Sequence, residues 1–165
     1  MTKRQHNNIR ANFVRVCKLH IIIGLLFTAQ IIAYDAGKLI TPEVVLKRWL
    51  ATSILVIVAA MCWYIARLSD TPRAIHRVAW VLIAMDIALA SFYVYTTRGM
   101  ASRAVILFVI PILVAAVLAR KGMIYLTAVA AIVTYTVTAI AYFVLNFNEG
   151  YKLELYGEIG FYSVL

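Results

Sequence analysis

Charge is the scarcest property of this sequence. Only 14% of its 165 residues are Asp, Glu, Lys or Arg, whereas about a quarter are charged in an ordinary soluble domain. Hydrophobic residues make up 64% of the chain, against about half in a soluble domain. A domain of this size exposes much of its surface, so such an apolar excess is stable only where the solvent is lipid. The composition therefore excludes a water-soluble globular domain and predicts an integral membrane protein.

Cysteine and catalytic motifs are also scarce. The two cysteines, Cys17 and Cys62, form no CxxC pair and have no histidine at metal-ligand spacing, so the sequence predicts free thiols and no metal site. It has no Walker loop, no GxSxG elbow, no HExxH pair and no paired carboxylates. We therefore expect neither enzymatic activity nor a bound cofactor in this chain.

Positive charge is in excess, with 16 Lys and Arg against 7 Asp and Glu and a net charge of +9. These cations lie in short clusters between apolar runs and not in one stripe with interleaved aromatic residues, which argues against nucleic-acid binding. Membrane lipids are the expected partners. The sequence also leaves open that the chain forms a homodimer or belongs to a larger membrane complex.

Five apolar stretches approach the length of about 20 residues that a helix needs to cross a bilayer. They cover 19–36, 44–68, 74–96, 103–119 and 122–147. The connections are short and rich in turn residues, so consecutive helices must run antiparallel. The sequence thus predicts an all-α, polytopic transmembrane helix bundle of about five spans. A basic arm over 1–18 precedes the bundle, and an acidic tail over 148–165 follows it.

The distribution of Lys and Arg predicts the orientation of this bundle. Ten of the 16 fall in the amino-terminal arm and in the second and fourth connections, and six fall on the other side. Cytoplasmic segments of membrane proteins carry the excess of Lys and Arg, so the amino terminus is predicted to be cytoplasmic. Five spans then leave the tail outside. Its apolar last residues, FYSVL, predict the start of a sixth helix in a longer parent chain.

One carboxylate lies near the middle of a predicted span. A charged side chain at the depth of Asp86 costs about 3 kcal/mol on insertion scales, so Asp86 should face protein or water. Two interpretations stay open: a proton, ion or ligand site, or a protonated acid that hydrogen-bonds a neighbouring helix. The candidate intramembrane polar site comprises Asp86, Gln30, Thr134 and Thr138. For the two threonines, a helix-packing face is the simpler interpretation.

A second candidate site lies in the third connection, where Arg98 and Arg103 flank Gly99. Two guanidinium groups beside a tight turn can hold an anion or a lipid headgroup. The simpler interpretation is that both arginines snorkel to the membrane interface. Pro111 lies inside the fourth apolar stretch and predicts a helix kink there.

The segment from Met85 to Gly122 combines several features in a particular order. A helix containing Asp86 leads to an aromatic-rich end, an outer loop with Thr and Gly, an apolar helix with Pro111, and a basic turn that ends at Gly122. This order resembles the membrane input region of bacterial sensor histidine kinases. The resemblance implies six helices with both ends inside, a place in the bacterial cytoplasmic membrane, and a role in two-component signal transduction.

The chain departs from that family in two respects. Its outer loop reads RGMASRA and lacks the Asn-Pro-Phe that is implicated in quinone binding in some members, and it has no phosphoacceptor helix or ATP-binding box. The favoured function is therefore a membrane sensor module without its catalytic output domain. Two alternatives are a small transporter or channel subunit, with Asp86 as coupling acid, and an assembly subunit that packs through small-residue faces.

Overall fold

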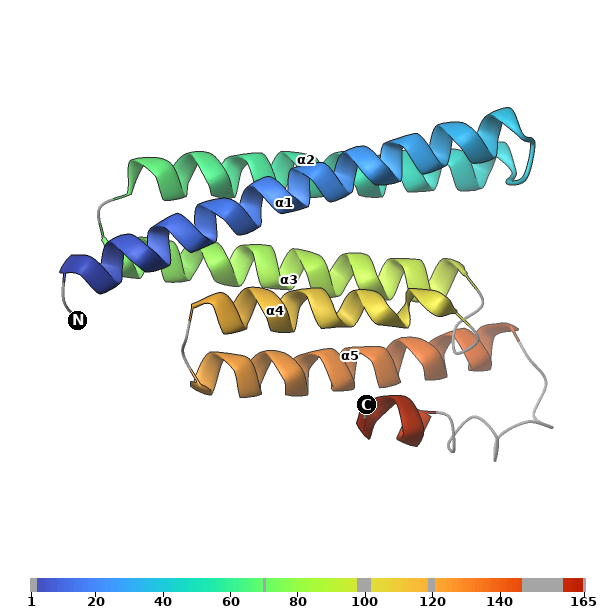
Figure 1. The fold of residues 1–165 in the computed structure, drawn as a ribbon. Coiled ribbons are helices and arrows are strands. Elements are labelled where there is room, and N and C mark those ends of the chain that lie inside the picture. The colour runs from blue at the N-terminus through green and yellow to red at the C-terminus, as the bar shows by residue number, and fades with distance from the viewer. Residues whose placement is uncertain (1–2, 70, 98–101, 119–120, 147–158, 165) are drawn as a thin grey trace. The chain divides into compact units, whose positions relative to one another are not determined.

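The structure is a computed structural model that describes residues 3–69, 71–97, 102–118, 121–146 and 159–164. None of these residues is in a strand. The helices are α1 (Lys3–Ala36), α2 (Pro42–Leu68), α3 (Pro72–Thr96), the 3-10 helix η2 (Arg103–Phe108), α4 (Val109–Val117) and α5 (Lys121–Asn146). Residues 159–164 are also helical (Figure 1). The chain forms two compact units, Met1–Met85 and Asp86–Leu165, and the boundary between them falls within α3.

Four helices in the described part of the chain are long and apolar enough to cross a membrane. They are Asn7–Ala36 within α1, and the whole of α2, α3 and α5. The prediction of an all-α transmembrane bundle is confirmed. In the stretch predicted over 103–119, the described residues are helical over Arg103–Val117, in two parts, and this helical segment is shorter than the other four.

Two prolines fix where helices begin. Pro42 is the first residue of α2 and Pro72 is the first residue of α3. A proline suits this position because its φ is already helical and the missing N–H would have no acceptor within the helix. Both helices therefore begin two residues before the apolar spans predicted at 44 and 74. Helix α1 begins at Lys3 and runs without a break from the basic arm into the apolar stretch.

In the first unit, α1 and α2 pack against each other as an antiparallel pair (Figure 1). Most of their buried positions are three, four or seven residues apart, which places them on one face of each helix. On α1 these positions are Phe13, Cys17, His20, Gly24 and Ile31, and on α2 they are Ala51, Thr52, Leu55, Ala59, Cys62 and Ala66. Most of the α2 residues are small, so the two backbones approach closely, as is common in membrane helix pairs.

In the second unit, α5 packs against the end of α3 and against η2. Its buried residues recur at every fourth position: Met123, Thr127, Ala131, Tyr135, Ala139 and Phe143. The core cluster joins the last four of these to Ala90 and Val94 of α3, Phe108 of η2, and Ile159. An edge-to-face ring pair between Tyr95 and Tyr142, with centroids 5.8 Å apart, adds a second contact between α3 and α5.

Helix η2 begins at a capped end and passes directly into α4. The Ser102 hydroxyl accepts a hydrogen bond from the backbone N–H of Ala104 at 3.0 Å, and also hydrogen-bonds the Thr97 hydroxyl. Pro111 is buried at the third residue of α4, directly after the end of η2. The change from 3-10 to α-helix falls just before Pro111, and the helix kink predicted at this residue stays a prediction.

Candidate functional site

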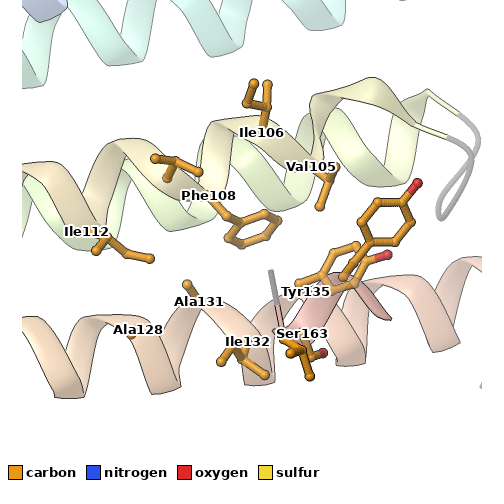
Figure 2. Close-up of a pocket in the computed structure, with 12 residues that line it drawn as sticks. Val105, Ile106, Phe108, Ile112, Ala128, Ala131, Ile132, Tyr135 and Ser163 are labelled. Carbon is orange, nitrogen blue, oxygen red and sulfur yellow. The ribbon is translucent and has the colours of Figure 1, made fainter. Parts of the chain in front are cut away.

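A pocket of about 490 Å³ lies between η2, α4, α5 and the helical residues 159–164 (Figure 2). This volume falls within the range of small-molecule sites in proteins, which is about 300–1,000 Å³. The pocket is lined by Val105, Ile106, Phe108, Val109, Ile112, Ala128, Ala131, Ile132, Tyr135, Tyr162, Ser163 and Val164. Aliphatic and aromatic side chains predominate, so the pocket suits an apolar ligand.

Tyr135 joins three parts of this pocket. Its ring meets the ring of Phe108 edge to face, with centroids 5.9 Å apart, and the ring of Tyr162 in the same way, with centroids 6.2 Å apart. Such pairs contribute about 0.5–1.5 kcal/mol beyond the area they bury. Phe108 belongs to η2 and Tyr162 to residues 159–164. A change in the position of Tyr135 would therefore alter the ring contacts of α5 with both segments.

Polar groups in the pocket are few. The Ser163 hydroxyl donates to the carbonyl of Ile159 at 2.7 Å, which leaves its oxygen able to accept one more hydrogen bond. The phenol-bearing side chain of Tyr135 is 3% exposed. No lining residue carries a formal charge. The pocket can therefore bind and orient an apolar molecule that has a few polar atoms.

Metal binding has no support in the described residues. Nowhere among residues 3–69, 71–97, 102–118, 121–146 and 159–164 do three His, Cys, Asp or Glu side chains gather where they could hold a metal ion. Cys17 and Cys62 form no disulfide, and both are buried.

The structure distributes the predicted intramembrane polar residues over both units. Asp86 of α3 is buried, with 5% of its surface exposed, and belongs to the second unit. Thr134 and Thr138 are half-buried and flank the buried stripe of α5. Gln30 is exposed on α1 in the first unit, where its side-chain amide donates to the Tyr34 hydroxyl one turn later, at 3.2 Å. The role of these four residues as one site stays a prediction.

The predicted outer-loop site is only partly described. Arg98 and Gly99 lie outside the described residues, and Arg103 is exposed at the first position of η2. Ser102, which the sequence analysis passed over, caps η2 from a buried position with 5% exposure. A serine directly before a helical stretch is a known N-cap signal, so this role was detectable.

The pocket itself was not predicted. Tyr135 and Phe108 stand in apolar stretches where any aromatic residue fits, and no local signal distinguishes a pocket wall from a lipid-facing side chain. The four-residue spacing of Tyr135 with other buried α5 positions predicts which face of α5 is buried, but not that the space beside this face is incompletely filled.

The fold and the pocket together define a multi-helix transmembrane domain with an apolar cavity and no catalytic group in its lining. The sequence model of the PilS-like transmembrane domain matches residues 2–165, and the chain belongs to this family. It is thus a sensor-kinase-like membrane domain, as the order of features between Met85 and Gly122 predicted. No curated protein and no solved structure matches the chain significantly.

Proposed function

We propose that this chain is the membrane input module of a bacterial signal-transduction protein. The observation that carries this proposal is the extent of the family match, which covers residues 2–165 and so includes every described helix. The chain contains no motif for phosphoryl transfer. We therefore assign it reception of a signal, not catalysis, and place it in the cytoplasmic membrane with its amino terminus inside.

The pocket beside Tyr135 is the proposed point of signal reception. A molecule that enters from the lipid meets η2, α4, α5 and residues 159–164 at once. It stabilises whichever arrangement of these segments it fits best, and in this way shifts the population of the bundle toward that arrangement. Small rearrangements of packed helices are a common means of passing such a shift to an output domain.

The test is a chimera in which residues 1–165 are joined, through one further transmembrane helix that returns the chain to the cytoplasm, to the dimerisation and catalytic domains of a histidine kinase. Ala128→Leu places three additional carbon atoms in the pocket lining, whereas Val129→Leu adds one carbon to a neighbouring side chain that is 56% exposed and outside the lining. We expect Ala128→Leu to change autophosphorylation about fivefold or more, the lower end of typical allosteric coupling. Val129→Leu should leave it unchanged.

Two results would contradict the proposal in different ways. Equal phosphorylation with and without residues 1–165 removes the input role altogether. A chain that influences the kinase but responds equally to both substitutions keeps the input role and removes the pocket as its receptor site. Stable co-purification with a larger complex, with no influence on the kinase, favours an assembly subunit.

A further inference from the structure

Among the described residues, one end of the first unit carries cationic side chains and no carboxylate. Here α1 begins, α2 ends and α3 begins (Figure 1). Three exposed cationic side chains lie at this end, Arg67, Arg73 and Arg77, and two more, Arg15 and Lys18, lie farther along α1. Among the described residues of the unit, the carboxylates are Asp35 and Glu43, and both lie at the opposite end, where α1 ends and α2 begins. Asp70 lies outside the described residues.

Arg10 fixes the geometry of this end. Its Nε donates to the carbonyl of Ala66 at 3.1 Å, and its Nη2 donates to the carbonyl of Arg67. These carbonyls belong to the last turn of α2, whose partial negative charge would otherwise repel an anion. Arg10 therefore offsets that charge and ties α1 to α2. The guanidinium of Arg67 in turn lies over the Trp63 ring, 5.6 Å from its centroid, which restricts its position.

Exposed apolar side chains follow the cations along the same helices. Leu19 and Ile22 come directly after Lys18 on α1, and each is 53% exposed. Val81, one turn beyond Arg77 on α3, is 55% exposed. A cationic end that continues into exposed aliphatic surface matches a molecule with an anionic group attached to hydrocarbon. A nucleic acid and a free phosphate ion are anionic but carry no hydrocarbon chain, so neither would contact the aliphatic surface.

We propose that this end of the first unit binds an anionic phospholipid, with the headgroup phosphate beside Arg73 and Arg77 and the acyl chains against the neighbouring aliphatic side chains. Basic surfaces at the ends of transmembrane helices attract anionic headgroups electrostatically. The site does not depend on the proposed signalling function, since a transporter or an assembly subunit would hold the same lipid.

The experiment measures quenching of tryptophan fluorescence by brominated lipid. The chain is reconstituted into phosphatidylcholine vesicles that contain increasing fractions of brominated phosphatidylglycerol, or of brominated phosphatidylcholine with the same acyl chains. A Trp49→Phe background leaves emission from Trp63 and Trp80, because the chain has three tryptophans and Trp49 lies near the start of α2, at the other end of the unit. We expect half-maximal quenching at a several-fold lower fraction of the anionic lipid.

The charge variant is Arg73→Gln with Arg77→Gln. Both side chains are exposed, so the fold should tolerate the change. Its matched control is Lys38→Gln with Lys47→Gln, which removes two exposed cations at the opposite end of the unit. We expect the charge variant to raise the half-maximal fraction of brominated phosphatidylglycerol at least fivefold, and the control to leave it unchanged.

Equal quenching by the anionic and zwitterionic lipids would overturn the proposal. Loss of the preference in both double variants would also overturn it, since it would then reflect net charge and not this surface. A last experiment measures whether inorganic phosphate, at matched ionic strength, displaces the brominated lipid. If it displaces the brominated lipid as effectively as unlabelled phosphatidylglycerol does, the surface binds phosphate alone.

Discussion

Gly24 of α1 lies directly against the side chain of Val56 of α2, so closely that a Cβ atom on Gly24 would overlap the Val56 Cγ2 methyl group. We expect Gly24→Ala to destabilise the fold, because overpacking costs about 1–3 kcal/mol and exceeds the gain of about 1 kcal/mol from better helix propensity. In a Val56→Ala background the overlap is gone, so the same substitution should become neutral or stabilising. Reversible unfolding in mixed micelles measures both effects. A destabilisation of equal size in both backgrounds would contradict the contact.

Arg10 should contribute to stability through the end of α2. Arg10→Ala removes two hydrogen bonds that the charged guanidinium donates to the carbonyls of Ala66 and Arg67. A hydrogen bond with one charged partner contributes about 1.5–3 kcal/mol to stability. We expect a loss of about 1–3 kcal/mol in the free energy of unfolding, since solvent recovers part of the bonding. Arg15→Ala is the control, because Arg15 is exposed on the same helix. Equal losses in the two variants would contradict a specific role of Arg10.

Ser102 should determine whether η2 forms. Ser102→Ala removes the side-chain acceptor of the Ala104 N–H, and loss of an N-cap typically costs about 0.5–2 kcal/mol. Ser102→Asp retains an acceptor and should restore most of that loss. Hydrogen exchange of the amides over 103–108 reports the effect locally. Unchanged protection in Ser102→Ala would show that the cap is not needed.

Asp86 separates the proposed function from the transporter alternative. Asp86→Asn keeps the shape and an acceptor at this buried position, so stability should change by less than about 1 kcal/mol, whereas Asp86→Leu removes the polar group and should cost about 1–3 kcal/mol. Reconstituted vesicles that contain a pH-sensitive dye measure proton flux. We expect no flux that depends on Asp86. Flux in the original chain that Asp86→Asn abolishes would favour a transporter.

Hydropathy predicted the positions of the long helices because their apolar lengths are a direct consequence of the bilayer. It did not predict their first residues. The starts of α2 and α3 are set by Pro42 and Pro72, which lie outside the apolar windows. Helix α1 also begins outside its apolar window, at Lys3. Hydropathy reports which residues contact lipid and not which residues are helical.

The candidate site was harder to predict than the fold. Asp86 was found because an acid in an apolar helix is conspicuous, and its burial agrees with the expectation that it avoids lipid. Phe108, Tyr135 and Tyr162 were not found as a group, because their ring contacts join residues far apart in sequence. Only the packing of η2 and residues 159–164 against α5 brings them together.

The 3-10 winding of η2 also alters how far a short segment can reach. A 3-10 helix rises about 2.0 Å per residue and an α-helix about 1.5 Å. The six residues of η2 and the nine of α4 therefore extend about 25 Å, roughly 3 Å more than the same residues would as one α-helix. The hydrocarbon layer of a bilayer is about 30 Å thick, so the additional length of about 3 Å makes up a large part of the difference between this segment and the layer. Mutations that convert η2 to α-helix should therefore draw the two ends of this segment deeper into the bilayer, or thin the lipid around it.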